Sequence, residues 1–245
     1  MKICDLLQEI NNFASFDLCA EWDNSGLIIG DYDSEVKKIA VTLDAVPEAV
    51  IKASELNCNL LITHHPLIFR GLKRINYNNW LGLAIKEAIK REINIIALHT
   101  NFDRAESGVN SILAKKINLE DCENLSDYGI KGNLREKMSL KNFLEFVKNS
   151  WNLTQIDYYF ENERDIKRVA LCGGSGSEFW EFAKDCDIYI TCDMKYHELI
   201  DAVRSGLVMA LCNHGEMERA SLQELSKKFN AVLLDIKALN NHGRI

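Results

Sequence analysis

From residue 38 onward, short apolar runs alternate with segments in which apolar residues recur every three to four positions. Short apolar runs bounded by polar residues are typical of buried strands, whereas the spacing of three to four is typical of helices packed on a sheet. This alternation predicts a βαβ order. The expected strands are 39–43, 59–63, 93–98, 168–171, 188–191, 207–211 and 231–234, and the expected helices are 48–56, 81–90, 109–116, 178–183, 197–204 and 217–228.

The two series of strands and helices predict an α/β protein built from two α/β halves, residues 1–128 and 129–245. A more polar stretch between the series carries an expected helix at 140–149 and an aromatic strand at 156–160. We place the boundary near 126–132, because Gly129 and Gly132 weaken regular structure there. No proline-rich linker separates the halves, so we expect them to pack closely.

Composition narrows the class of protein. With 245 residues, 47% of them hydrophobic, the chain can bury a substantial core. The formal net charge of -7 argues against a broad electrostatic grip on nucleic acid or on an acidic membrane. The eight cysteines include no Cys-x-x-Cys pair, which favours reduced, mostly buried thiols.

The amino terminus reads as an amphipathic helix with charged residues inside its apolar pattern, unlike the hydrophobic region of a signal peptide. No apolar run reaches the roughly 18 residues that a membrane-spanning helix needs. We therefore expect a cytoplasmic protein.

The candidate chemistry begins with His64 and His65, which directly follow the expected strand 59–63. In open α/β sheets, ligand sites gather beyond the carboxyl ends of the strands. Adjacent side chains on an extended backbone point to opposite sides, so two imidazoles here could serve two neighbouring metal ions. A lone His-His pair is more often a polar turn element, and partners at other strand ends must decide between these interpretations.

Suitable partners follow two other expected strands. Asp103 comes shortly after strand 93–98, and His214 and Glu218 follow strand 207–211. If a helix opens near Gly215, His214 and Glu218 lie on one face of it. Taken singly, these residues also fit a helix start, a turn or a helix cap. Together they form a nitrogen and oxygen ligand set that suits Zn, Mn, Fe, Co or Ni better than Ca or Cu(I).

Two further histidines are candidate catalytic residues. His99 directly follows strand 93–98, and we assign it to supporting a metal ligand or to proton transfer. A partly buried histidine bonded to backbone is an equally good interpretation. His197 follows strand 188–191 on an expected helix that Asp193 could cap, and its alternative is a simple exposed side chain.

Two glycine-containing loops flank this chemistry. The loop 172–177 joins a strand to a helix, where backbone amides can cradle an anion, but it lacks the Lys-Ser/Thr ending of a phosphate loop. We therefore favour a tight turn. Residues 22–27 could form the rim of a pocket, although turn chemistry is the simpler interpretation.

The chain resembles the Nif-three-like family, whose members often carry the name GTP cyclohydrolase I type 2. Five separated segments in the same order carry the resemblance, which covers nearly the entire chain: 21–27, 63–67, 99–103, 173–176 and 214–218. It implies two similar α/β halves around a central cleft, in the short form without an inserted domain, and a toroidal hexamer built as a trimer of dimers. It also implies a centre of two divalent metal ions per subunit, with His64, His65, Asp103, His214 and Glu218 as ligands.

The function that follows is a metal-dependent hydrolase of a nucleotide or related heterocycle, with ring opening of GTP as the specific candidate. Two metal ions would lower the pKa of a bound water and polarise the attacked atom. A phosphoester or pyrophosphate hydrolase would use the same centre equally well. An alternative of another class is a metal-binding or metal-delivery protein, or a ring-shaped scaffold, without catalysis.

Overall fold

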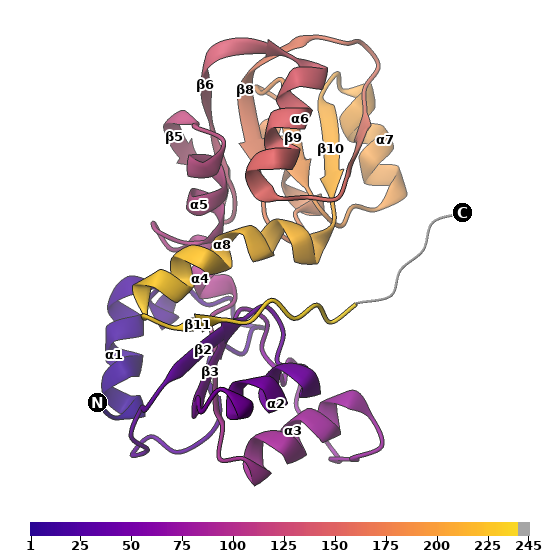
Figure 1. Cartoon of the computed structure of the whole chain (residues 1–245). Helices are drawn as coiled ribbons and strands as arrows, with labels where there is room; N and C mark the ends of the chain where they lie inside the picture. The colour runs from indigo at the N-terminus through magenta and orange to yellow at the C-terminus, as the bar shows by residue number, and fades with distance from the viewer. Residues whose placement is uncertain (240–245) are drawn as a thin grey trace. The chain divides into compact units, whose positions relative to one another are not determined.

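The apolar runs form two separate sheets, each with its own helices, in a mixed α/β fold (Figure 1). The structure is a computed structural model that describes residues 1–239. Unit 1 holds Met1–Ala105 and the segment that begins at Leu222, and unit 2 holds Glu106–Ser221. The two halves expected from the sequence, 1–128 and 129–245, have other limits, and residues 240–245 of the second lie outside the described part.

Unit 1 contains a five-stranded sheet in the order β1-β4-β3-β2-β11. β2, β3 and β4 are parallel neighbours, while β1 pairs antiparallel with β4. Every residue of these three parallel strands is buried, which explains why each appears in the sequence as a continuous apolar run. The strands are β1 (Gly26–Ile29), β2 (Ile39–Thr42), β3 (Leu60–Thr63), β4 (Asn94–Ala97) and β11 (Val232–Leu233).

The helices of unit 1 include the amphipathic amino-terminal helix that the sequence predicts. Its buried positions, Ile3, Leu6 and Ile10, are spaced three and four residues apart. α2 begins with Pro47 in its first turn, where a missing N–H costs no helical hydrogen bond. The elements are α1 (Ile3–Phe13), the 3₁₀ turn η1 (Phe16–Leu18), α2 (Pro47–Glu55), α3 (Trp80–Lys90) and α4 (Thr100–Arg104).

Unit 2 contains a six-stranded sheet in the order β5-β6-β8-β9-β10-β7. β8, β9 and β10 are parallel neighbours, and β6 and β7 add to them antiparallel. The strands are β5 (Glu120–Asn124), β6 (Ile130–Ser139), β7 (Ile156–Tyr159), β8 (Asp165–Leu171), β9 (Ile188–Thr191) and β10 (Val208–Cys212). The helices are α5 (Val109–Lys116), α6 (Leu140–Trp151), the 3₁₀ helix η2 (Ser177–Ala183), α7 (Tyr196–Arg204) and α8 (His214–Lys228), whose last part belongs to unit 1.

The expected strands and helices are confirmed within a few residues, but the expectation of weak structure around Gly132 is wrong. β6 runs through Gly132 and pairs on both sides, with β5 and with β8. Gly129 lies in the connection between β5 and β6 with a positive φ of 84°, a conformation that favours glycine. β5 is exposed along its whole length, so it has no apolar run by which to be recognised.

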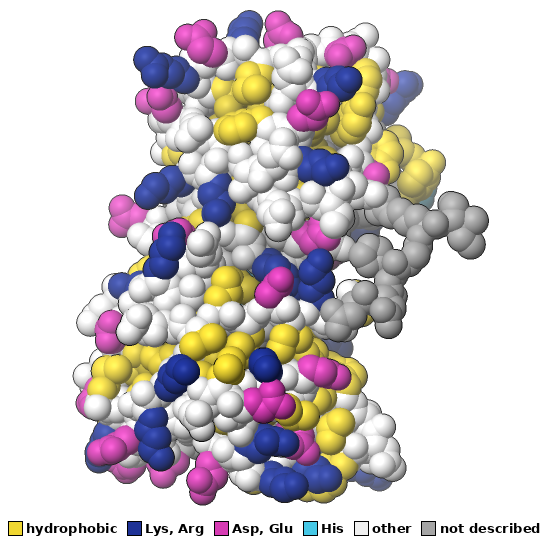
Figure 2. All heavy atoms as spheres, in the orientation of Figure 1, with side chains coloured by type: hydrophobic (Ala, Val, Ile, Leu, Met, Phe, Trp, Pro, Cys, Tyr) yellow, Lys and Arg dark blue, Asp and Glu magenta, His cyan; other side chains and the backbone are white. Residues whose placement is uncertain are grey.

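Two hydrophobic cores support the sheets, one in each unit. Leu61 and Ile95 lie in the core of unit 1 and Tyr189 and Met209 in that of unit 2. None of the eight cysteines forms a disulfide, and five of them are buried. None of the helices in the described part of the chain is long and apolar enough to cross a membrane. On the face drawn in Figure 2, acidic and basic side chains lie intermixed.

The core of unit 1 provides a first prediction. Leu61 is fully buried in β3, so replacing it by Ala should lower the free energy of unfolding by about 3 kcal/mol. Urea unfolding followed by circular dichroism measures the change. Leu72→Ala is the matched control, because Leu72 is 39% exposed and should cost less than about 0.5 kcal/mol. Equal losses in the two variants would contradict this assignment of the core.

Candidate metal centre

The carboxyl ends of three parallel strands bring the candidate side chains of unit 1 to one edge of the sheet. The register aligns Thr42, Thr63 and Ala97 as the last residues of β2, β3 and β4. The polar residues that follow each strand therefore leave the sheet at the same level. Asp44 follows β2, His64 and His65 follow β3, and His99 follows β4.

The two adjacent imidazoles lie side by side rather than on opposite sides of the chain. Their ring centroids are 5.1 Å apart, with an angle of 43° between the ring planes. The expectation of opposite sides required an extended backbone, but β3 ends at Thr63 and the chain bends at His64 and His65. Both rings thus reach the same region from one strand end.

The imidazoles of His64, His65 and His99 are each oriented through the Nδ1 atom. The His64 Nδ1 lies 2.8 Å from the Leu98 carbonyl oxygen. The His65 Nδ1 lies 2.7 Å from the Asp44 carboxylate. The His99 Nδ1 lies 2.7 Å from the Asp23 carboxylate. A carbonyl or an ionised carboxylate only accepts hydrogen bonds, so each Nδ1 donates its proton and each Nε2 presents a lone pair in the neutral ring.

These oriented rings form a group that could hold a metal ion. One ring nitrogen from each of His64, His65 and His99 can be chosen so that all three lie within 4.8 Å of one another. Asp103 on α4 adds a carboxylate, whose Oδ1 is 3.6 Å from the His64 Nε2. His64 is fully buried, and burial strengthens binding of a cation to such a group because water competes less.

Asp23 is the most heavily hydrogen-bonded acid in this region. Besides His99, it accepts hydrogen bonds from the Thr100 backbone N–H and hydroxyl, at 3.1 and 2.5 Å, and from the Ser25 hydroxyl at 3.0 Å. Burial by itself raises the pKa of this carboxyl, but the hydrogen bonds from His99 and Thr100 outweigh it and hold the pKa well below its usual range. Asp23 is therefore a fixed negative charge behind the His99 ring.

Unit 2 carries a second group at the start of α8. His214 and Glu218 lie one turn apart on the same helix face, with 3.1 Å between the His214 Nε2 and a Glu218 carboxylate oxygen. The His214 Nδ1 is 2.6 Å from the Asp193 carboxylate. Burial by itself lowers the pKa of His214. The hydrogen bonds and negative charges of Glu218 and Asp193 together outweigh this effect and raise the pKa to about 9. As in unit 1, a carboxylate behind the ring fixes which way the Nε2 points.

The loop after β8 closes over this second group. Gly174 has a φ of 70°, and a Cβ placed on it would lie 2.6 Å from the Glu218 Oε1 and 3.4 Å from the His214 Nε2. The loop bends at Gly173 and Gly174, in line with the tight turn that the sequence favours, and the Gly174 backbone lies close to both side chains. Only glycine permits this approach without displacing Glu218.

The predicted site residues fall into two groups within the units. Unit 1 brings together His64, His65, His99 and Asp103, and unit 2 brings together His214 and Glu218. His197 is exposed on α7, where its ring contacts Tyr196, and the metal-competent groups found among the described residues do not include it. Its catalytic role stays a prediction.

Three carboxylates behind the imidazoles were not identified as such from the sequence. Asp44 follows a predicted strand, so the strand-end rule that found His64 could have found it. Asp193 was expected to cap α7, yet the cap residue is Lys195 and the Asp193 carboxylate contacts His214 instead. Asp23 lies 76 residues from His99, and no local pattern indicates their pairing.

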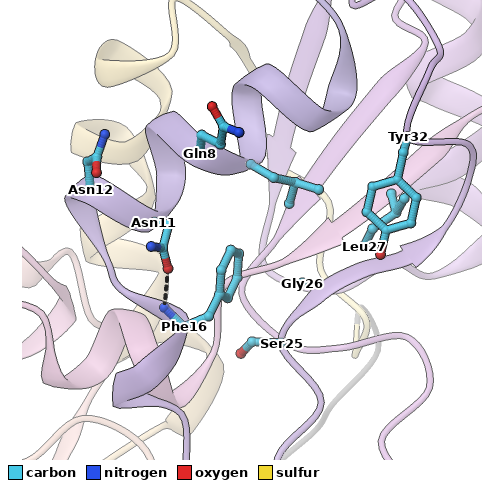
Figure 3. Close-up of a pocket in the computed structure, with 9 residues that line it drawn as sticks. Gln8, Asn11, Asn12, Phe16, Ser25, Gly26, Leu27 and Tyr32 are labelled. Carbon is cyan, nitrogen blue, oxygen red and sulfur yellow. Dashed lines mark hydrogen bonds between the residues drawn. The ribbon is translucent and has the colours of Figure 1, made fainter.

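A separate hollow of about 650 Å³ in unit 1 lies between α1 and β1 (Figure 3). Its polar lining is made of neutral side chains such as Gln8, Asn11 and Asn12. The Asn11 side chain accepts a hydrogen bond from the Phe16 N–H at 2.8 Å. Because none of the predicted ligands lines this hollow, we do not place the candidate site there.

The donor set fits a transition metal of borderline softness. Imidazole nitrogens and carboxylate oxygens bind Zn, Fe, Mn, Co and Ni, and ligating histidines commonly donate their second N–H to a carboxylate or carbonyl. His64, His65 and His214 all show that arrangement. The buried histidine and carboxylate groups could therefore hold a metal ion.

Known proteins match this chain over nearly its whole length, including every predicted ligand. The sequence signature of the Duf34/NIF3 (NGG1p interacting factor 3) family matches residues 1–241. A Lactococcus lactis protein named "GTP cyclohydrolase 1 type 2 homolog" is 34% identical, over 97% of this chain and 95% of its own length. A Campylobacter jejuni protein of the same name is 32% identical, over 96% of this chain and 95% of its own length.

Solved structures of similar proteins also match nearly the whole chain. The Staphylococcus aureus hypothetical protein SA1388 has a TM-score of 0.90 and 29% identity, and the match covers 100% of this chain and 99% of that one. Reduced HcgD from Methanocaldococcus jannaschii has a TM-score of 0.85 and 27% identity, over 96% of this chain and 98% of that one. The mixed α/β fold with two sheets is thus shared with these proteins.

The buried Asp23 carboxylate generates a pH-dependent prediction. Asp23→Asn should lower the free energy of unfolding at pH 7 by about 2 kcal/mol, because hydrogen bonds to a charged acceptor are lost. The pKa of the Asp23 carboxyl is lower in the folded protein than in the unfolded chain. The stability that the ionised Asp23 contributes is therefore complete above about pH 4 and is lost progressively as the pH falls below it. Urea unfolding at several pH values should show the gap between wild type and variant narrowing below about pH 4.

Asp17→Asn is the matched control, since Asp17 is an exposed acid of the same unit. It should change the free energy of unfolding by less than about 0.5 kcal/mol at pH 7. A gap for Asp23→Asn that stays constant down to pH 3 would contradict a role for its ionised form.

The close approach of Gly174 generates a third prediction. Gly174→Ala should weaken metal binding by about tenfold or more, because the new methyl group displaces Glu218 and strains the backbone. Titration with Zn²⁺ against a competing chelator measures the affinity. Gly71→Ala is the control, because nothing lies within 4 Å of a Cβ there. Unchanged zinc affinity in a folded Gly174→Ala protein would remove His214 and Glu218 from the ligand set.

Proposed function

The chain belongs to the Duf34/NIF3 (NGG1p interacting factor 3) family, and we propose that it is a hydrolase that uses two divalent metal ions to act on a nucleotide or related heterocycle. The relatives named "GTP cyclohydrolase 1 type 2 homolog" make ring opening of GTP the specific candidate.

One observation carries the proposal: four imidazoles are each held through Nδ1 by an acceptor. His64 is held by a carbonyl, and His65, His99 and His214 are held by carboxylates. A histidine that only stabilises a fold needs no such uniform orientation. The arrangement supports metal binding because it presents the Nε2 atoms and increases their basicity.

We propose that two ligand groups complete one centre for two ions. The first ligand group is His64, His65 and Asp103 of unit 1, and the second ligand group is His214 and Glu218 of unit 2. Asp103 and Glu218 would supply the carboxylate ligands of this centre. Zn, Fe, Mn, Co and Ni all suit this donor set.

When bound, the ions would supply a water of lowered pKa and would polarise the attacked atom. His99 is the general base of the proposal, since its Nε2 can accept a proton while the Asp23 carboxylate stabilises the resulting imidazolium. With GTP, water adds at the imidazole carbon of guanine, and hydrolysis of both C–N bonds at that carbon releases formate. His197 stays a candidate for contact with the substrate.

Two alternatives use the same ligands. A phosphoesterase would direct the activated water at phosphorus instead of carbon. A metal-delivery protein or scaffold would bind the ions without turnover. A hexamer in the cytoplasm is proposed for each of these functions, and light scattering of the purified protein tests the assembly.

The joint centre makes a quantitative prediction about metal content. His64→Ala with His65→Ala in unit 1 should remove most of the bound metal, and His214→Ala with Glu218→Gln in unit 2 should remove as much. Two independent sites would each lose only their own share. Elemental analysis of the purified proteins measures the content, and His197→Ala is the control that keeps the full content.

The proposed reaction is tested with the metal-loaded protein. Incubation with GTP should release formate, dependent on added divalent metal, and His99→Gln should reduce kcat about a hundredfold or more while metal content is kept. Turnover of phosphoesters without formate release from GTP would replace the cyclohydrolase with the phosphoesterase. Full metal content with no turnover of either class would favour the scaffold.

A further inference from the structure

We propose that Trp22 and Phe69 form an aromatic platform that stacks the planar ring of the substrate beside His99, and that the basic segment Arg70–Arg74 binds its phosphate. This inference deepens the proposed function and rests on it for the reaction. It identifies the substrate class as a nucleotide from the groups that surround the candidate centre.

The platform consists of two exposed rings next to a catalytic candidate. The Trp22 and Phe69 ring centroids are 5.7 Å apart, and both rings contact His99, with centroid distances of 6.2 and 6.1 Å. Trp22 is 60% exposed and Phe69 is 43% exposed. Large aromatic side chains that stay open to solvent beside a polar cluster indicate a surface for an apolar or aromatic ligand.

Hydrogen bonds from the residues next to Trp22 hold this platform in place. The Asn24 side-chain amide donates to the Ile68 carbonyl at 2.5 Å, which ties the Trp22 turn to the chain just before Phe69. The Asp23 carboxylate fixes the His99 ring. Neighbouring residues of one turn thus connect the two aromatic rings and the imidazole, so that little ordering is needed when a ligand ring binds.

The segment after Phe69 is basic although the whole chain is acidic. Between Asn57 and Lys86 the sequence contains three Lys or Arg residues, Arg70, Lys73 and Arg74, and no Asp or Glu. Arg70, Lys73 and Arg74 are exposed, and within residues 1–239 none of them makes an ion pair. Cations that lack a carboxylate partner are available for an external anion, and arginine forks match phosphate oxygens well.

A planar ring on the platform and a phosphate on the adjacent basic segment are the two parts of a nucleotide. Stacking is tolerant of ring identity because every base has a π face. The platform therefore accounts for recognition of a nucleobase as a class. Its contact with His99 would bring the ring of the substrate next to the proposed general base.

Binding measured separately for each part of the ligand tests this inference. The probes are guanosine, guanosine 5′-monophosphate and ribose 5-phosphate, used with the metal-loaded protein and equilibrium dialysis. Trp22→Ala and Phe69→Ala should each weaken binding of guanosine and its monophosphate about tenfold and leave ribose 5-phosphate unchanged. Trp22→Phe should restore most of the affinity.

Substitutions in the basic segment Arg70–Arg74 should give the opposite pattern of binding losses. The double variant Arg70→Ala with Arg74→Ala should weaken binding of both phosphorylated probes about tenfold and leave binding of guanosine unchanged. Trp80→Ala and Lys52→Ala are matched controls in the same unit, since Trp80 is 59% exposed and Lys52 pairs with Glu55. Both should bind every probe like the wild type.

Failure of this inference is distinguishable from failure of the proposed function. Guanosine affinity that is equal in Trp22→Ala, Trp80→Ala and wild type, or that is absent in wild type, overturns the platform even if formate is released. Selective loss of ring binding in the folded, metal-replete Trp22→Ala protein supports the platform even if no formate appears.

Discussion

The candidate centre depends on one interaction, the hydrogen bond from an imidazole Nδ1 to an acceptor beside it. An imidazole that rotates freely presents either nitrogen in many directions, so binding an ion would cost the freedom of each ring. Here the Leu98 carbonyl, Asp44, Asp23 and Asp193 each fix one ring. The orientation of each ring is therefore set during folding, before any ligand binds.

The strand order provides these acceptors. Parallel neighbours end at the same level, so the residue after one strand lies beside the residue after the next. His65 is held by Asp44 from beyond β2, and His64 is held by the end of β4. Unit 2 repeats the arrangement, because Asp193 follows β9 and His214 follows β10. In both sheets, an acid that follows one strand thus orients a histidine that follows the neighbouring strand.

The strand-end rule explains how much the sequence could predict. Buried parallel strands are continuous apolar runs, so the residues that follow them, His64, His65 and His99, could be identified directly. Asp23 could not, because its partner is distant in the sequence and its own segment has the composition of an ordinary turn. β5 was missed for a related reason, since an exposed strand has no apolar run. The pairing of β11 with β2 involves only two residues per strand, and no local pattern in the sequence indicates it.

That pairing has a consequence for how the protein emerges from the ribosome. Unit 2 is one continuous stretch of chain, and its strands are all made before residue 213. The sheet of unit 1 instead lacks its outer strand until synthesis has passed Leu233, so the edge of β2 stays open for most of translation. An open edge is a template for pairing with other chains. The edge of β2 is therefore open to such pairing in the nascent protein until β11 has been made.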